Sequence, residues 1–278
     1  MNLPFDPTTL DSVTLAILAA GMVVTGMISG TLAGLLGVGG GIVIVPVLFW
    51  VLQTFKIAPE YASHLAVATS LATIIPTSIS SMRAHNKRGT VDRDLLKLWG
   101  PAVIVGAVIG GALAKVVSGD SLRSIFGVVG LLVAINMMIP KTLVISEHLP
   151  SSNWINRVIA GVIGIISSLM GIGGGTLSVP TLSAFSFPVH RAVGTASAMG
   201  LMIAIPGVIG FIYAGLGVEG LPPASLGFVS IPAALIISPV SYLFAPQGAK
   251  LAHALNQRVL KLVFALFLSV TAARMLLA

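Results

Sequence analysis

A glycine-rich motif that occurs twice is the feature that most constrains this chain. Residues 37–46 read GVGGGIVIVP and residues 171–180 read GIGGGTLSVP, so the triple glycine and the closing Val-Pro recur at an offset of 134. The segments that follow also match, since residues 66–70 read AVATS and residues 192–196 read AVGTA. The chain is therefore an internal duplication. A repeat unit of this length is typical of transporters whose two halves enclose the substrate path.

The composition places this duplication in a membrane. The mean hydropathy is +1.04, 56% of residues are hydrophobic and only 8% are charged, whereas a soluble domain carries about 25% charged residues. We predict a polytopic membrane protein in contact with the lipid bilayer. The net charge of +7 comes from residues in short loops, so no nucleic-acid partner is predicted. There is no cysteine, and no positively charged region precedes the first apolar run, which is predicted to be a retained span and not a signal peptide.

Each half contains five apolar runs. About 20 helical residues are needed to cross about 30 Å of hydrocarbon, and lipid offers no partner to unpaired backbone groups. We therefore predict an all-α membrane protein with about ten hydrophobic helical segments in two five-segment repeats. The expected segments cover residues 12–36, 38–54, 62–82, 98–118 and 122–140 of the first half and residues 154–170, 172–187, 192–214, 226–246 and 257–277 of the second.

The distribution of Lys and Arg predicts the orientation. The loop after the third segment is rich in basic residues and is expected to be cytoplasmic (Arg83, Lys87, Arg88, Arg93 and Lys97). Five segments per half make the second half enter from the opposite side, so the repeats are predicted to be inverted, with both termini outside. The predicted organisation is a first membrane repeat (1–140), a linker (141–153) and a second membrane repeat (154–278), without independently folding domains.

The second and seventh segments begin with the glycine motifs and are short and interrupted by proline. Such paired segments point to a transporter's binding site, where they either span the membrane or re-enter it. Glycines before a helix expose backbone N–H groups at the positive end of the helix dipole, which suits a small anion. The alternative is that the glycines only allow close helix packing. A shared site requires both motifs to reach one depth. The candidate substrate-binding glycines are Gly37, Gly39, Gly40, Gly41, Gly171, Gly173, Gly174 and Gly175.

Hydroxyl and basic side chains in the third and eighth segments are the other candidates. Hydroxyls at matching depths can donate to an anion's oxygens, or they can bond to helix carbonyls instead. The four hydroxyl candidates are Thr69, Ser70, Thr195 and Ser197. His64 and Arg191 begin these segments and could attract the anion or, for histidine, carry a proton, although side chains near helix ends also extend to lipid headgroups.

Acidic residues are absent from all ten predicted segments. The chain therefore lacks a membrane-embedded carboxylate pair for acid–base catalysis and a carboxylate relay for protons or sodium. No zinc-protease, serine-hydrolase or nucleotide-binding motif is present either. We predict that the protein is not an enzyme and that it needs no metal or cofactor.

Taken together, the paired GxGGGxxxVP motifs, the A-V-x-T-[SA] segments after them and the loop RAHNKRGTVD at residues 83–92 resemble the sulfite exporter TauE/SafE family of membrane permeases. The resemblance runs from about Thr25 to Leu277. It departs at Ala196, which stands where the first half has Ser70.

This resemblance implies a multi-pass transporter of the bacterial inner membrane, with both termini expected to be periplasmic. The expected substrate is a small sulfur-containing anion such as sulfite, thiosulfate or an organosulfonate, exported by alternating access between the two inverted halves. An anion-selective channel that uses the same backbone N–H site is the alternative. The sequence leaves open which anion is carried, in which direction, with which coupling ion, and whether the protein is a monomer or a homodimer.

Overall fold

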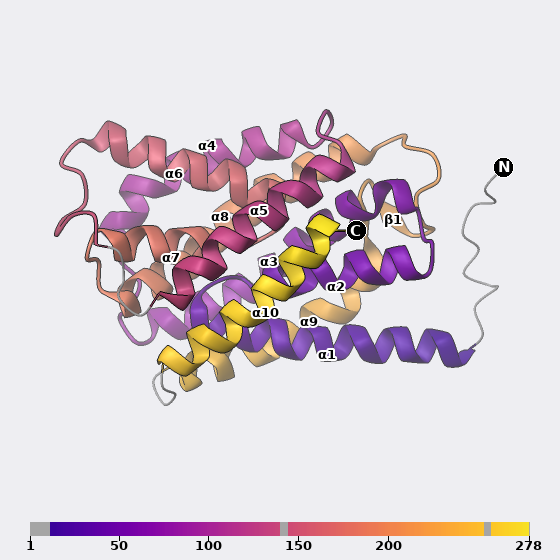
Figure 1. The fold of residues 1–278 in the computed structure, drawn as a ribbon, viewed down its shortest axis with the longest axis horizontal. Coiled ribbons are helices and arrows are strands. Elements are labelled where there is room, and N and C mark those ends of the chain that lie inside the picture. The colour runs from indigo at the N-terminus through magenta and orange to yellow at the C-terminus, as the bar shows by residue number, and fades with distance from the viewer. Residues whose placement is uncertain (1–11, 140–143, 253–256, 278) are drawn as a thin grey trace.

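The computed structural model describes residues 12–139, 144–252 and 257–277 (Figure 1). These residues form ten α-helices, one short 3-10 helix and one small β-hairpin, so the predicted all-α membrane fold is confirmed. Seven of the described helices are long and apolar enough to cross a membrane. The elements are α1 (Ser12–Leu36), α2 (Gly41–Thr54), η2 (Pro59–Tyr61), α3 (Ala62–Asn86), α4 (Arg93–Leu113), α5 (Gly119–Met138), α6 (Asn153–Met170), α7 (Gly175–Ala184), α8 (Val189–Gly215), β1 (Ser225–Leu226), β2 (Val229–Ser230), α9 (Ile231–Leu251) and α10 (Gln257–Leu277).

The long helices run roughly along the longest dimension of the molecule (Figure 1). Helix α1 lies along one edge beside α9, and α4 lies along the opposite edge beside α6. The hairpin β1–β2 lies at one end of this bundle, which we call the hairpin end. Helices α4 and α8 begin at the other end, which we call the Asp92 end after the residue that precedes α4.

Two helices begin five residues away from their predicted starts. Helix α4 begins at Arg93 and not at residue 98, because the Asp92 carboxylate accepts hydrogen bonds from the amides of Asp94 (3.0 Å) and Leu95 (2.9 Å) and so caps a charged first turn. Helix α9 begins at Ile231, and the prediction of helix over residues 226–230 is wrong. These apolar residues complete the antiparallel hairpin instead, in which Leu226 pairs with Val229.

Glycines allow two pairs of helices to pack backbone against backbone. If Gly34 of α1 carried a β-carbon, that atom would lie 1.9 Å from the carbonyl oxygen of Ala245 in α9. A β-carbon on Gly164 of α6 would lie 2.3 Å from the carbonyl oxygen of Val103 in α4. Close approach through small residues is the usual way in which membrane helices associate. We call these contacts the α1–α9 seam and the α4–α6 seam, and each joins one helix of the predicted first half to one of the second.

A buried polar contact in the α4–α6 seam gives a first testable expectation. The Trp99 indole N–H donates to the side-chain oxygen of Asn156 at 3.1 Å, and both residues are almost completely buried. Replacing Trp99 with phenylalanine leaves that oxygen without its donor, so the free energy of unfolding should fall by about 1–3 kcal/mol. Unfolding in detergent micelles would measure this. Trp154→Phe is the matched control because Trp154 is exposed, and equal losses for the two variants would contradict the expectation.

Candidate functional site

The two glycine motifs are in direct contact inside the protein. The first forms the turn between α1 and α2, and the second forms the turn between α6 and α7. The amide of Gly173 donates a hydrogen bond to the carbonyl oxygen of Val38 at 3.1 Å. A β-carbon on Gly39 would lie 2.9 Å from the α-carbon of Gly173, so the chains touch where neither residue has a side chain. The structure thus brings together the two motifs, as a shared site would require.

Contacts around the motifs recur in matching pairs. A β-carbon on Gly37 would lie 2.5 Å from the carbonyl oxygen of Val193, and one on Gly171 would lie 2.8 Å from the α-carbon of Val67. Val67 and Val193 occupy equivalent places in the duplicated Ala-Val segments. Each motif therefore packs on the long helix that follows the motif of the other half.

The backbone conformations of the motifs are not identical. Gly40 has a φ of +82° and precedes α2 in a left-handed conformation, whereas Gly174, in the equivalent place, has a φ of −57°. A side chain at Gly40 would therefore be strained by the backbone. At Gly174 the obstacle is packing alone, because a β-carbon there would lie 2.8 Å from the β-carbon of Met199.

The two threonine candidates make equivalent hydrogen bonds to backbone amides. The Thr69 hydroxyl accepts from the amide of Ser230 at 2.9 Å, and the Thr195 hydroxyl accepts from the amide of Asp92 at 2.8 Å. Ser230 and Asp92 are the residues immediately before α9 and α4. Each threonine thus fixes the start of a helix from the other half, while its own O–H remains able to donate.

The two serine candidates use their hydroxyl hydrogens within the protein. Ser70 donates to the carbonyl oxygen of Gly171 at 2.7 Å, and Ser197 donates to that of Gly194 at 2.6 Å. A hydroxyl carries a single hydrogen. Both serines therefore bond to backbone carbonyls in this structure, which is the alternative to binding an anion. The Ser70 bond also joins α3 to the second motif.

His64 and Arg191 lie at opposite ends of the bundle. Arg191 forms an ion pair with Asp92, which is itself buried, and its guanidinium lies 5.5 Å from the centre of the Phe187 ring. The His64 ring nitrogen Nε2 lies 3.0 Å from the carbonyl oxygen of Val117, near the hairpin end. The structure does not bring these two side chains together.

Buried hydroxyls without a partner surround the second motif, and sequence reasoning missed them. Leaving such a group unpaired costs about 1–3 kcal/mol. Thr176 and Ser178 stand in α7 where the first half has Ile42 and Ile44, so a comparison of the aligned repeats could have found them. Within the part of the chain that the structure describes, the hydroxyls in this region that have no hydrogen-bond partner are those of Ser78, Ser167, Ser168, Thr176 and Ser178.

The Ser78 hydroxyl, which belongs to α3, and the second motif both lie close to Gly200 of α8. A β-carbon on Gly200 would lie 2.5 Å from the Ser78 hydroxyl oxygen and 3.8 Å from the amide nitrogen of Gly174. The described residues contain no group of three or more His, Asp or Glu side chains that could hold a metal ion. The polar groups named here around the motif are hydroxyls and backbone amides, which are neutral hydrogen-bond donors.

Comparison with known proteins agrees with this architecture. The model of the sulfite exporter TauE/SafE family matches residues 22–275. The chain belongs to this family. It is 34% identical over 255 residues to a probable membrane transporter protein of Haemophilus influenzae, covering 91% of this chain and 96% of that one. It is 29% identical over 266 residues to one of Methanocaldococcus jannaschii, covering 92% and 94% of the two chains.

A third relative, a probable membrane transporter protein of Bacillus subtilis, is 30% identical over 213 residues, which cover 70% of this chain and 78% of that protein. No solved structure matches the chain significantly. The TauE/SafE protein described here is accordingly a multi-pass membrane transporter.

Proposed function

We propose that this transporter exports a small sulfur-containing anion, such as sulfite, thiosulfate or an organosulfonate, across the bacterial inner membrane by alternating access, with both termini in the periplasm. The observation that carries the proposal is the buried contact between the two glycine motifs, next to hydroxyls that have no partner within the protein. The described ends of the chain support the orientation, because α1 begins and α10 ends towards the same end of the bundle (Figure 1).

Backbone groups around the motifs are suited to an anion. Helices α2 and α7 begin at Gly41 and Gly175, and the glycines before them provide no capping side chain. The first amides of a helix have no intrahelical partner and carry a partial positive charge of about half a unit. Glycine also lets an anion approach the backbone closely. Thr69 and Thr195 retain their own O–H groups as additional donors.

The seams affect which parts would move. Because α1 is locked to α9 and α4 to α6 by backbone contacts, we propose that the units that rock against each other contain helices of both halves. The two ends of the bundle differ in structure, and this difference supports alternating access. A cavity opens at the hairpin end, whereas at the other end the ion pair between Asp92 and Arg191 joins the start of α4 to α8.

A flux measurement tests the proposed function. Protein reconstituted into liposomes should carry sulfite or thiosulfate with a rate that saturates with concentration, and a gradient of one anion should drive the other against its own gradient. Flux that does not saturate and never runs against a gradient would support the anion-selective channel instead. Absence of flux and of any thermal stabilisation by a panel of sulfite, thiosulfate, taurine and sulfate would overturn the proposal, because a ligand of the folded state must raise the unfolding midpoint.

Because the Thr176 hydroxyl has no partner among the described residues, its removal should affect the stability of the anion-free protein and the affinity for the anion differently. Valine has nearly the same shape but cannot donate a hydrogen bond. Removing a buried, unpaired hydroxyl should leave the anion-free protein equally or more stable. If the hydroxyl donates to the anion, Thr176→Val should nevertheless weaken binding, by about tenfold or more, since a hydrogen bond to a charged group contributes about 1.5–3 kcal/mol. Thermal unfolding with and without thiosulfate gives both quantities.

Thr271→Val provides the matched control. Thr271 is equally buried, but its hydroxyl donates to the carbonyl oxygen of Leu268 in α10. That variant should be slightly less stable and should bind thiosulfate like the parent. If Thr176→Val instead loses stability and keeps its affinity, the Thr176 hydroxyl serves the fold and not the anion.

A further inference from the structure

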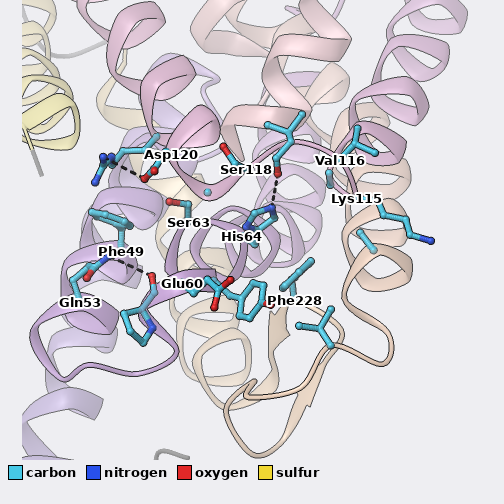
Figure 2. Close-up of a pocket in the computed structure, with 18 residues that line it drawn as sticks. Phe49, Gln53, Glu60, Ser63, His64, Lys115, Val116, Ser118, Asp120 and Phe228 are labelled. Carbon is cyan, nitrogen blue, oxygen red and sulfur yellow. Dashed lines mark hydrogen bonds and ion pairs between the residues drawn. The ribbon is translucent and has the colours of Figure 1, made fainter. Parts of the chain in front are cut away.

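A cavity of about 600 Å³ lies at the hairpin end, within the size range of small-molecule sites (Figure 2). Its wall consists of the end of α2, the short helix η2, the start of α3, the α4–α5 loop, the start of α5, the end of α8 with the residue Val218 after it, and the residue Phe228 of the hairpin. The glycine contact described above does not line this cavity.

His64 forms part of the cavity wall and is held in one orientation. Its side chain is only 6% exposed, and its ring centre lies 4.7 Å from that of Phe228. Its Nε2 lies 3.0 Å from the carbonyl oxygen of Val117, and because a carbonyl can only accept, Nε2 must carry the hydrogen. In the neutral ring Nδ1 is then a bare acceptor, and this buried atom has no hydrogen-bond partner among the residues that the structure describes.

Other polar groups lie next to this atom. A β-carbon on Gly119 would lie 3.2 Å from the carbonyl oxygen of Glu60, 3.7 Å from the Ser63 hydroxyl oxygen and 3.8 Å from His64 Nδ1, so the backbone of Gly119 approaches the imidazole closely where it has no side chain. Gly119 is also the first residue of α5, whose preceding residue, Ser118, accepts a hydrogen bond from the amide of Ser121. The first amides of a helix have no partner within the helix and lie at its positive end, where they can donate to an anion.

The remaining charges around the cavity cancel. Lys115 of the α4–α5 loop and Arg123 of α5 contribute two positive charges, and Glu60 of η2 and Asp120 of α5 contribute two negative ones. Arg123 and Asp120 form an ion pair at 3.3 Å. The wall also contains the phenol of Tyr61, and α2, α8 and the hairpin contribute no titratable group to it. A proton on His64 would therefore give the cavity a net positive charge.

We infer that this cavity binds a small oxyanion together with one proton, which His64 Nδ1 takes up. The inference rests on the proposed function for the class of anion. A proton from the medium at the hairpin end forms the Nδ1–H bond, the new N–H donates to an anion oxygen, and the proton leaves when the anion leaves. Val67, which contacts Gly171, lies about one helical turn further along α3, so His64 is about one turn of α3 away from the glycine contact.

Counting protons tests this inference directly. Purified full-length protein in detergent is mixed with thiosulfate, which remains a dianion across the neutral range, so any proton taken up belongs to the protein. Near neutral pH in weak buffer, the parent should take up close to one proton per thiosulfate bound when His64 is neutral beforehand. As the pH rises and the imidazole of the anion-free protein loses its proton, thiosulfate affinity should fall by up to tenfold per pH unit.

His64→Gln separates the proton from the structural bond. The glutamine amide can still donate to the carbonyl oxygen of Val117 but cannot take up a proton. This variant should bind thiosulfate without proton uptake and without the pH dependence. His148→Gln, at an exposed residue of the linker, should behave like the parent and serves as the control.

The outcomes distinguish the two proposals. If the parent and His64→Gln take up equal numbers of protons and share one pH profile, the inference about His64 is overturned while the proposed transport of the anion stands. A parent that binds thiosulfate with no proton uptake overturns it too, without reliance on any variant. A parent that neither binds nor carries any of the anions overturns the proposed function, and this inference with it.

Discussion

Gly173→Ala is expected to reduce anion transport to background. The new β-carbon would lie 2.5 Å from the carbonyl oxygen of Val38 and 2.8 Å from the α-carbon of Gly39. Both are backbone atoms of the other motif, so the contact can only be relieved by separating the motifs. The backbone of Gly173 does not have a positive φ, and alanine therefore tests packing and access at this point without backbone strain. Sulfite flux in liposomes, normalised to the inserted protein, measures the effect.

Gly161→Ala is the matched control for this loss of transport. Gly161 lies in α6, the helix that leads into the second motif, and its β-carbon would meet only the carbonyl oxygen of Ala102 at an ordinary 3.7 Å. This variant should transport like the parent. If Gly173→Ala folds to a monodisperse, thermally stable protein and still carries sulfite at the parental rate, the motif contact is not part of the substrate path.

The second large effect is expected for Gly34→Ala, which should lower stability. A β-carbon on Gly34 would lie 1.9 Å from the carbonyl oxygen of Ala245 and 2.6 Å from the amide nitrogen of Ala249. Overpacking usually costs about 1–3 kcal/mol, and more when the neighbours cannot move. Backbone atoms of α9 cannot move without opening the α1–α9 seam, so we expect a loss at or above the upper end of this range. Unfolding in mixed micelles would measure it.

Gly21→Ala controls for the intrinsic effect of alanine in α1. No atom lies within 4 Å of the β-carbon position at Gly21. In a helix interior alanine is more favourable than glycine by up to about 1 kcal/mol, so this variant should be equally or more stable. Similar stabilities of the two variants would show that the α1–α9 seam accommodates a methyl group.

Local sequence patterns predicted most of the fold. Apolar runs are sufficient to identify membrane helices, because lipid forces each apolar segment to satisfy its own backbone. The duplicated motif also identified the two turns that meet. The starts of α4 and α9 could not be found by hydropathy, since the first turns of α4 are charged and the residues before α9 are apolar yet belong to a hairpin.

The candidate site was predictable only in part. A shared site required the two motifs to meet, and the structure places them in contact, whereas the partners of the hydroxyls depend on contacts between distant segments. Thr69 and Thr195, for example, accept from residues 161 and 103 positions away. The isolated Nδ1 of His64 likewise follows from the position of Val117 in another loop.

The α1–α9 seam also has a consequence for biosynthesis. Helix α1 is made early, but the backbone of Ala245 against which Gly34 packs follows roughly 200 residues later. At translation rates of about 5–20 residues per second, α1 must wait roughly 10–40 s for its partner. During that time its glycine face meets only lipid or the insertion machinery. Synthesis that stops before α9 would therefore leave the glycine face of α1 without the backbone on which it packs.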